Sequence, residues 1–230
     1  MPRDLNGGWL SNANGRGLLA SLSRELVEQL VGSASPIRYP KHSNLYLDGS
    51  PNAALVLSGL LRCCLAAPDG RQVTIRYSRP GDLVVPLPGR HALDIRVEVV
   101  ESADVIHLDL ARIRALAAHH PEVALALHDE AWRRLPDAIG ALAASAFLTV
   151  RSRVARDLVA RAQLRGPLRS GARLYVTSQE LADATGSVRE VVARAIQRLR
   201  EDRMIATTTG AITILDPESL ASTAGIELAA

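Results

Sequence analysis

RLYVTSQELADATGSVREVVARAIQRLREDRMIATTTGAITIL, residues 173–215, is the stretch that decides the fold of this chain. It begins with a run typical of a short strand, residues 173–176, which leads into Thr177-Ser178-Gln179-Glu180. In a capping box of this form, the hydroxyl at the start accepts a backbone N–H, and the glutamate three residues later reaches back to the first residue. The pattern predicts a helix over residues 179–184 that ends at the glycine turn Thr185-Gly186.

A second helix is expected directly after this turn. Ser187-Val188-Arg189-Glu190 repeats the capping-box spacing and predicts a helix over residues 189–201. Two helices joined by a tight turn with glycine form a helix-turn-helix. The strand-like residues 204–208 and 211–215 flank Thr209-Gly210 and predict a hairpin, the wing. An ordinary two-helix hairpin would show a similar pattern.

The second helix has a polar face that favours a nucleic-acid function. Arg189 and Glu190 lie in its first turn, where the groove-reading residues of a recognition helix concentrate. Arg194, Gln197 and Arg198 follow on the same side, and the apolar residues face the other way. We therefore interpret residues 173–215 as a winged helix-turn-helix with double-stranded DNA as its partner.

The charge of the chain is unevenly distributed. The 230 residues have a formal net charge of +3. Residues 1–149 contain 15 basic and 15 acidic residues, whereas residues 150–210 contain 12 arginines and 6 acidic residues. A basic half beside a neutral half is typical of a domain that meets a polyanion, although a moderately basic surface without a partner is the simpler alternative. No apolar run reaches the roughly 18 residues of a membrane helix, so no membrane partner is expected.

The remaining composition excludes other classes of protein. The polar, Gly/Asn-rich residues 1–14 do not resemble a secretory signal. The only two cysteines, Cys63 and Cys64, are adjacent and cannot form a disulfide framework, so we expect a cytoplasmic protein. We find no Gly-rich phosphate loop, metal-ligand spacing or nucleophile elbow. We therefore expect neither enzymatic activity nor a cofactor or metal.

The sequence pattern of the N-terminal half predicts a β-domain. A short amphipathic helix over residues 17–31 precedes it. From Ile37 to about Asp109, short β-rich runs alternate with turn signals, of which Pro68-Asp69-Gly70 is the clearest hairpin. This alternation of short strands and turns predicts an antiparallel barrel or jelly roll. The expected strands are residues 45–47, 54–57, 60–66, 73–77, 83–85, 95–100 and 105–108.

A long helix is expected over residues 121–147, followed by a further helix over residues 150–164. Apolar residues recur along the first of these at spacings of three and four, which is the a/d seam of a dimerisation helix. The alternative is a helix that packs on its own domain. Pro136 requires that this helix kink or break in two. The seam and candidate dimer interface consists of Leu125, His128, Trp132, Leu135, Ile139 and Leu142.

Residues 178–220 resemble the DNA-binding domain of the cyclic-AMP receptor / fumarate-nitrate regulator (Crp/Fnr) family. They share its Ser/Thr-x-x-Glu-Leu-Ala helix, glycine turn, Arg-Glu-x-x-x-Arg helix and wing. Residues 55–84, with a strand–Gly–strand, an Asp-Gly hairpin and a Pro-Gly-Asp turn, are similar to the family's β-roll. The resemblance implies an α+β fold: an antiparallel, cyclic-nucleotide-binding-like jelly roll (residues 1–120), a dimerisation helix (121–147) and a winged helix-turn-helix (148–230).

The resemblance also implies roles for individual residues in a dimeric regulator that binds an inverted repeat. Arg189, Glu190 and Arg194 match the family's base-reading residues, and a half-site of the TGTGA type with G·C pairs is expected. Arg can hold both acceptors of guanine, and Glu can accept from the cytosine amino group. RNA polymerase is a candidate second partner. The expected phosphate contacts are Thr177, Ser178, Gln179, Arg151, Arg153, Arg173 and Arg198.

Two departures from the family weaken parts of the resemblance. Val188 and Val191 stand where many relatives have Ser or Thr, so phosphate contacts there are lost. The Gly-Glu-Leu and Arg-Ser-Ala segments of cyclic-AMP binders are replaced by Val85-Pro86-Leu87 and Leu93-Asp94-Ile95. Ordinary cyclic-AMP binding is therefore not expected. By analogy, an effector pocket would be lined by Val85, Leu87, Arg96, His128 and Trp132.

Three hypotheses about function remain open. The chain is a regulator that responds to an unknown effector, a constitutive regulator of the same fold, or an interaction module that no longer binds DNA. The intact Arg-Glu-x-x-x-Arg pattern argues against the third. A haem sensor, with ligands among Cys63, Cys64, His91, His107 and His128, is a further alternative that lone histidines support only weakly.

Overall fold

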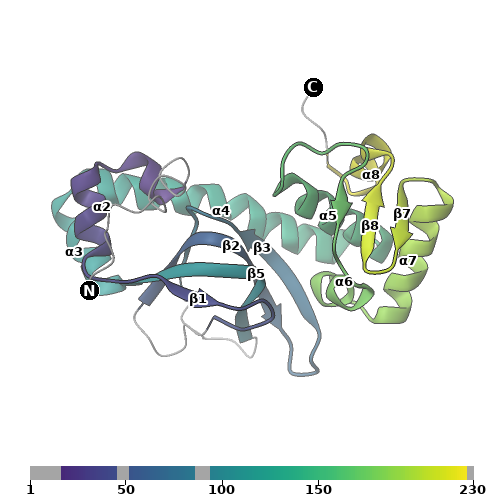
Figure 1. Ribbon diagram of the computed structural model, residues 1–230, viewed down its shortest axis with the longest axis horizontal. Coiled ribbons are helices and arrows are strands. Elements are labelled where there is room, and N and C mark those ends of the chain that lie inside the picture. Colours follow the sequence, from purple (N-terminus) through teal and green to yellow (C-terminus); the bar gives the residue numbers. More distant parts are fainter. Residues whose placement is uncertain (1–16, 46–51, 86–93, 227–230) are drawn as a thin grey trace. The chain divides into compact units, whose positions relative to one another are not determined.

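The computed structural model describes residues 17–45, 52–85 and 94–226 (Figure 1). The chain divides into two compact units. The first comprises Met1–Cys64 with Ile75–Ile139, and the second comprises Leu65–Thr74 with Gly140–Ala230. Each unit has a hydrophobic core of its own. The structure has no helix that is both long and apolar enough to cross a membrane, among the residues it describes.

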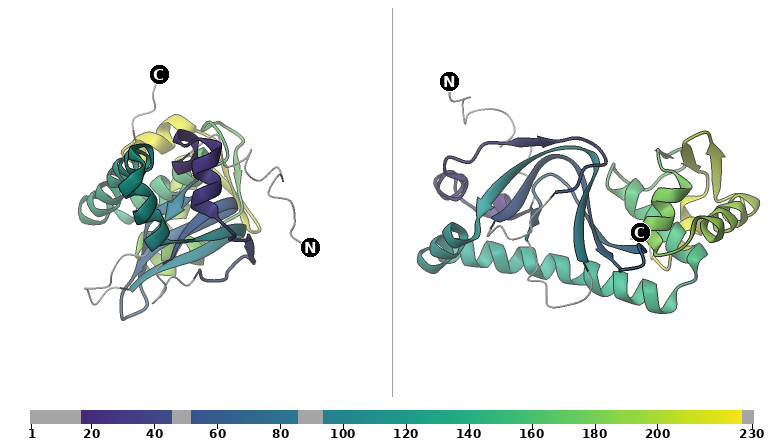
Figure 2. Two further views of the ribbon diagram at one scale, coloured as in Figure 1. Left: turned by 90° about the vertical axis from the view of Figure 1, so that its left-hand side faces the viewer. Right: turned by 90° about the horizontal axis from the view of Figure 1, so that it is seen from below.

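The N-terminal unit contains an antiparallel sheet that curls into a roll (Figure 2). Its strands follow the order β1-β5-β2-β3, and β4 pairs with β2. Register is shown by Ile37 opposite Val105 and by Ala54 opposite Val84. This confirms the predicted α+β fold with an antiparallel roll. The strands are β1 (Ile37–Tyr39), β2 (Asn52–Ala66), β3 (Gln72–Ser78), β4 (Leu83–Val84) and β5 (Asp94–Asp109).

Two strands are much longer than the sequence pattern predicts. The runs 54–57 and 60–66 are both part of β2, and the runs 95–100 and 105–108 are both part of β5. Gly59 has a φ of +83°, and a Cβ built on it would lie 2.4 Å from the carbonyl oxygen of Ser102. Ser58-Gly59 is therefore not a turn between strands but a bend where β2 closely approaches β5. The Pro68-Asp69-Gly70 turn is confirmed, with Gly70 at a φ of +85°.

The helix predicted over residues 17–31 is two elements. A short 3-10 helix, η1 (Leu18–Ser21), precedes α2 (Arg24–Val31). Ser23 separates them because its hydroxyl accepts the backbone N–H of Leu26 and so caps α2. Leu18, Leu19 and Leu30 are buried against β2, β5 and the helices that follow, in a cluster outside the roll.

The interior of the roll is filled by a separate apolar cluster. Alternate residues of the strands point inward, as the two-residue period of a strand requires. Tyr39 packs against the edge of this cluster. Its buried members are Leu45, Ala54, Val56, Leu61, Cys63, Val84, Val97, Val99, Ala103 and Val105.

Two helices follow the roll: α3 (Leu110–His119) and α4 (Pro121–Phe147). The bounds of α4 match the predicted helix 121–147. Pro136 lies inside α4, which remains one helix, so of the two expected outcomes, a kink or a break in two, the break does not occur. A proline removes one N–H and one hydrogen bond, a loss that the helix tolerates here. Val123 and Ala126 of α4 are buried, and Ala126 belongs to the cluster that contains Leu18, Leu19 and Leu30.

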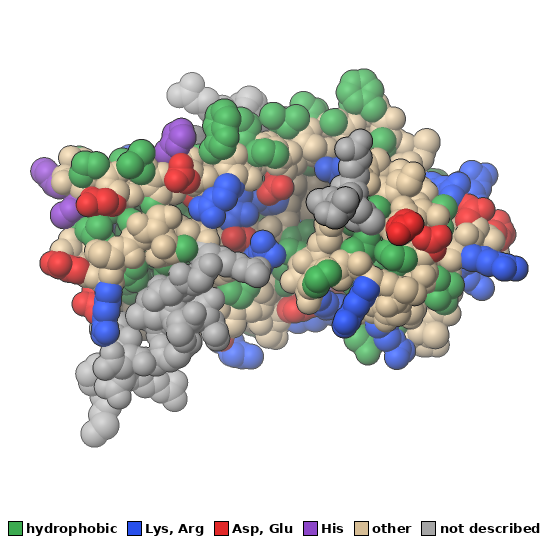
Figure 3. Space-filling view, turned by 90° about the horizontal axis from the view of Figure 1, so that it is seen from above, with side chains coloured by type: hydrophobic (Ala, Val, Ile, Leu, Met, Phe, Trp, Pro, Cys, Tyr) green, Lys and Arg blue, Asp and Glu red, His purple; other side chains and the backbone are tan. Residues whose placement is uncertain are grey.

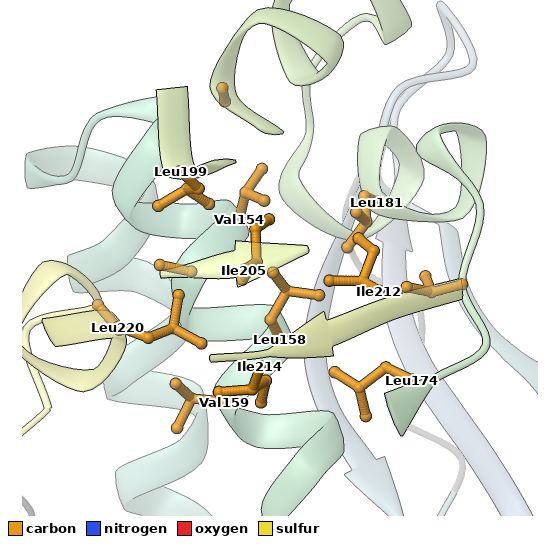
Figure 4. Packing of buried hydrophobic residues seen from close by; sticks show 14 of the residues in the cluster. Val154, Leu158, Val159, Leu174, Leu181, Leu199, Ile205, Ile212, Ile214 and Leu220 are labelled. Carbon is orange, nitrogen blue, oxygen red and sulfur yellow. The ribbon is translucent and has the colours of Figure 1, made fainter. Parts of the chain in front are cut away.

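The C-terminal unit consists of helices packed on a small sheet. Its helices are α5 (Val150–Gln163), α6 (Ser178–Thr185), α7 (Arg189–Glu201) and α8 (Pro217–Thr223). The strands β6 (Arg173–Leu174), β7 (Ile205–Thr208) and β8 (Ala211–Ile214) form a sheet in the order β6-β8-β7. Leu158, Leu181, Leu199 and Ile214 are fully buried in the core between these elements (Figure 4). The winged helix-turn-helix is thus confirmed, and α8 is an addition that the sequence analysis missed.

Candidate nucleic-acid interface

The N-terminus of α6 is fixed by the capping box that the sequence predicts. Thr177 Oγ1 accepts the backbone N–H of Glu180 at 3.1 Å, and Glu180 Oε2 accepts the backbone N–H of Thr177 at 2.7 Å. At the other end, Gly186 adopts the left-handed conformation, with a φ of +64° and a ψ of +33°. The backbone N–H groups of Gly186 and Ser187 both bond to the Ala182 carbonyl. These bonds end α6 sharply and direct the chain into α7.

The second capping box predicted from the sequence does not form. The backbone N–H of Ser187 bonds to α6, and the N-cap of α7 is Val188, which has an extended backbone and no side-chain cap hydrogen bond. The prediction of a second capping box was therefore wrong: the N-cap of α7 is one residue later than predicted, and its side chain cannot form a cap. The N-terminus of α7, next to the predicted base-reading residues, has backbone N–H groups that no side chain of the cap satisfies.

Val188→Ser should stabilise the C-terminal unit. Val188 is 52% exposed, so the exchange costs little buried apolar surface. A serine at the N-cap accepts an orphan N–H, and its gain over an aliphatic residue is about 1 kcal/mol. Urea unfolding of the full chain should show a higher midpoint for this variant. Val191→Ser, a change within the helix, provides the control and should not raise the midpoint.

The residues predicted to read bases are brought together on one exposed face of α7. Val192, Ala195 and Leu199 anchor the opposite face in the core. The Arg189, Glu190 and Arg194 side chains are exposed, and none forms an ion pair with another side chain in the described part of the chain. Gln197 differs, because its amide donates to Glu201 at 2.9 Å and accepts from Arg200. Two free guanidinium groups and one free carboxylate are thus available to a ligand.

The predicted phosphate-contact residues other than Arg151 and Arg153 fall into two groups. Thr177, Ser178 and Gln179 lie at the N-terminus of α6, where the N–H dipoles of the helix also favour an anion. Arg173 and Arg198 are exposed arginines of the same unit. The Gln179 amide also donates to Asp183 at 2.8 Å.

Arg151 and Arg153 are engaged in internal contacts. The guanidinium of Arg151 bonds to Asp202, the C-cap residue of α7, at 2.5 Å and so ties α5 to α7. Arg153 donates to the carbonyl of Ser145 at 3.4 Å, and burial lowers the pKa of its guanidinium. The structure thus shows both arginines holding the unit together.

The N-terminal unit contains a charge cluster that was not predicted from the sequence. Arg134 on α4 lies 2.5 Å from Asp82 and 2.6 Å from Glu130, and both carboxylates are buried. Glu130 also lies 3.0 Å from Arg133 and accepts the backbone N–H of Leu83 at 3.5 Å. The pKa of Arg134 is raised: burial alone would lower it, but the bonds to Asp82 and Glu130 outweigh that effect. The cluster ties α4 to the Pro-Gly-Asp turn. The four-residue spacing of Glu130 and Arg134 was the available sequence signal.

Four of the residues suggested for an effector pocket are exposed in the single chain. Val85 follows β4 and is exposed, and Arg96 is exposed on β5. His128 and Trp132 lie on the outer side of α4, where their rings stack with centroids 6.3 Å apart. Leu87 falls outside the described residues. The side chains that connect α4 to the turn at Asp82 are Glu130 and Arg134 instead.

The candidate metal and haem ligands have other partners or are buried. His107 Nε2 lies 2.8 Å from the hydroxyl of Tyr39, and burial lowers the pKa of this histidine. Burial also raises the pKa of Cys64 to about 11, so this thiol stays protonated at neutral pH. Cys63 lies 3.7 Å from the hydroxyl of Ser78. In the described part of the chain, no three His, Cys, Asp or Glu side chains are grouped as metal ligands. His91 lies outside that part.

One face of α4 carries large apolar side chains with no cover. In the space-filling view they appear along the upper edge, where α4 runs (Figure 3). Trp132 is 68% exposed and Leu142 is 71% exposed. These residues belong to the predicted seam, together with the exposed Leu125, Leu135 and Ile139. The seam is thus not part of the core of the single chain.

The roll, the long helix and the winged helix-turn-helix define a DNA-binding regulator with a sensor-like N-terminal unit. Residues 152–223 match the Crp-like helix-turn-helix domain. The transcriptional regulator LdrP from one strain of Thermus thermophilus is 32% identical over 205 residues, which cover 84% of this chain and 98% of that protein. The CRP-like cAMP-activated global transcriptional regulator of Mycobacterium tuberculosis is 26% identical over 89% of this chain and 95% of its own length.

A solved structure of another regulator has the same fold as this chain. The c-di-GMP responsive global regulator CLP of Xanthomonas campestris superposes with a TM-score of 0.72, at 20% identity, over 84% of this chain and 99% of that chain. The chain therefore belongs to the Crp/Fnr family and is a DNA-binding transcriptional regulator of the Crp/Fnr type.

Proposed function

We propose that this regulator acts as a homodimer on an inverted repeat and that Arg189, Glu190 and Arg194 read the bases of each half-site. The observation that carries the proposal is the exposed face of α7, on which these three side chains have no ion-pair partner among the described residues. Arginine can hold both acceptors of guanine, and glutamate can accept from cytosine. A half-site with G·C pairs, of the TGTGA type, fits this set.

The dimer follows from the geometry of DNA and from the exposed seam on α4. Two recognition helices must lie about 34 Å apart to read successive major grooves on one face of the duplex. A homodimer provides this symmetry, and an uncovered row of large apolar side chains is typical of a protein interface. We further propose that the regulator works in the cytoplasm as a binding protein without catalytic activity.

Phosphate contacts position the dimer on the duplex. We assign them to Thr177, Ser178, Gln179 and Arg198, because hydroxyl, amide and guanidinium groups and a helix N-terminus are the usual donors to phosphate oxygens. Arg151 and Arg153 already form contacts within the C-terminal unit, so we expect them to contribute less to phosphate binding.

Selection from random DNA tests the proposed readers. The wild type should select an inverted repeat with G·C pairs, and Arg189→Ala should lose the preference at one base pair of each half-site. The loss of one good bidentate contact costs roughly 1–3 kcal/mol at that pair. Arg200→Ala removes the same charge from the last turn of α7 and is the matched control. It should leave the selected motif unchanged.

The opposite pattern would refute the assignment. If Arg189→Ala lowers affinity equally for every sequence and selects the wild-type motif, Arg189 contacts phosphate and another residue reads the base. If the wild type selects no motif at all, sequence-specific binding itself is wrong for this chain.

A second candidate is a constitutive regulator that needs no effector. The charge cluster on α4 favours it, because two buried carboxylates already neutralise the Arg134 guanidinium at the roll. An anionic effector would have to displace them. Binding to the selected duplex should then be the same with and without cyclic AMP or cyclic di-GMP. A large change in affinity with either nucleotide would favour the effector-responsive regulator.

A further inference from the structure

The recognition helix α7 begins with an aliphatic side chain in an unfavourable place. Val188 is the N-cap of this helix, and its side chain makes no cap hydrogen bond. Aliphatic residues are far less favourable at an N-cap than Ser, Thr, Asp or Asn. Val188 is also 52% exposed, so the core gains little from it. Neither capping nor core packing therefore accounts for a valine here, and a residue that breaks a local rule in this way is often functional.

The backbone around Val188 is held in place by hydrogen bonds on both sides. The Val188 carbonyl oxygen accepts the backbone N–H groups of Val191 and Val192, each at 3.1 Å. The preceding Ser187 donates its N–H to the Ala182 carbonyl at 3.1 Å and so ties the turn to α6. A valine side chain is stiff, because it is branched at Cβ. Its two methyl groups are therefore presented in well-defined positions, and a ligand that contacts them orders little that was mobile.

The neighbours of Val188 are the proposed base readers. Arg189 and Glu190 follow it directly, and all three residues are exposed. The N-terminal residues of a recognition helix contact base edges in the major groove. Val188 has no polar side-chain atom, so it cannot donate a hydrogen bond to a phosphate oxygen or to a base. The group in the major groove that an apolar side chain can recognise is the C5-methyl of thymine.

We propose that Val188 contacts the methyl group of a thymine at the base pair next to the one that Arg189 reads, and that it thereby determines part of the specificity of the regulator. The inference rests on the proposed function, because it requires the N-terminus of α7 to lie in the major groove. A half-site of the TGTGA type has thymines beside its guanines. A hydroxyl at this position would serve affinity through phosphate, whereas the valine serves the choice of sequence.

Replacement of thymine by deoxyuridine tests the inference with the full chain. The probe is the inverted repeat selected from random DNA, in which one thymine position of both half-sites at a time carries deoxyuridine. Only the C5-methyl is lost, and the pairing with adenine is kept. Burial of one methyl group corresponds to about four-fold in affinity, so the dimer, with two half-sites, should bind about fifteen-fold more weakly when this thymine is replaced.

Val188→Ser is the variant that assigns the contact. Serine removes both methyl groups and provides a cap, so a change in DNA binding does not reflect unfolding. The variant should bind the thymine and deoxyuridine duplexes equally well where the wild type distinguishes them. A serine hydroxyl can donate to phosphate, so the ratio of the two affinities is the readout rather than either affinity alone. Val191→Ser, the same exchange at a half-buried position, is the control and should keep the wild-type ratio.

The outcomes separate this inference from the proposed function. If the selected half-site lacks this thymine, or the wild type binds the thymine and deoxyuridine duplexes equally at every position, Val188 contacts no thymine methyl, although the proposed base readers stand. If Val188→Ser keeps the wild-type ratio, another side chain contacts the methyl group and the inference is wrong. If the wild type selects no inverted repeat, the proposed function and this inference both fail.

Discussion

Leu142→Glu should convert the dimer into a monomer and abolish binding to the inverted repeat. Leu142 is 71% exposed in the single chain and lies on the apolar seam of α4 with Trp132 and Ile139. Burial of one leucine side chain contributes about 1.5–3 kcal/mol, and a symmetric dimer contains it twice. The loss of both should raise the dissociation constant of the dimer by about two to four orders of magnitude. Sedimentation at micromolar concentration measures this directly.

Two controls define the role of this face. Leu142→Met keeps the apolar volume and should remain a dimer with normal DNA affinity. Ser145→Glu places the same carboxylate three residues further along α4, at an exposed position outside the seam, and should have little effect. If the wild type is a monomer at micromolar concentration with and without DNA, α4 is not a dimerisation helix.

Asp157→Ala should destabilise the C-terminal unit by about 3–5 kcal/mol. Asp157 and Arg161 form an ion pair one turn apart on α5, at 2.6 Å, and both side chains are more than nine-tenths buried. Removal of the carboxylate leaves the guanidinium buried with its main charge partner gone, which is far costlier than the loss of an exposed pair. A typical domain has a total stability of about 5–15 kcal/mol, so the effect on a thermal or urea unfolding curve should be large.

The double variant Asp157→Leu/Arg161→Met is the control. With both charges replaced by apolar side chains of similar size, neither member of this pair stays buried without the other, and the unfolding midpoint should return close to that of the wild type. The exposed pair Arg24 and Glu28 on α2 offers a comparison, since Glu28→Ala should cost less than about 1 kcal/mol. Equal losses for Asp157→Ala and Glu28→Ala would contradict the interpretation.

The helix-turn-helix could be predicted closely from the sequence because its signals are local. The capping box at Thr177 and Glu180, the glycine at 186 and the apolar period of α7 each act within a few residues, and the bounds of α7 came out as expected. The exposed face of α7 that we propose reads bases follows from the same period, because the position of a residue along a helix fixes its side. A local signal was also available for α8, where Asp216 caps the helix and Pro217 occupies its first turn.

Other features depended on contacts between distant residues. Ser58-Gly59 looks like a turn in the sequence, and only the approach of β5 at Ser102 makes it a bend within β2. The assignment of a cap to Ser187 was wrong because the N-cap of α7 is the next residue, Val188, whose side chain makes no cap hydrogen bond. Arg151 looks like a free basic residue until α5 and α7 pack together and bring Asp202 beside it.

The sequence by itself determined the family, the order of the elements and the residues available on α7, since repeating patterns, caps and turns are set by near neighbours along the chain. The tertiary structure alone decided which charges are free and which are already paired. Arg189 and Arg194 remain exposed, whereas Arg134 pairs at the roll with both Asp82 and Glu130, although these residues are up to 52 positions apart. The physical reason is that burial and pairing depend on distance in space, which the spacing of residues along the chain does not fix.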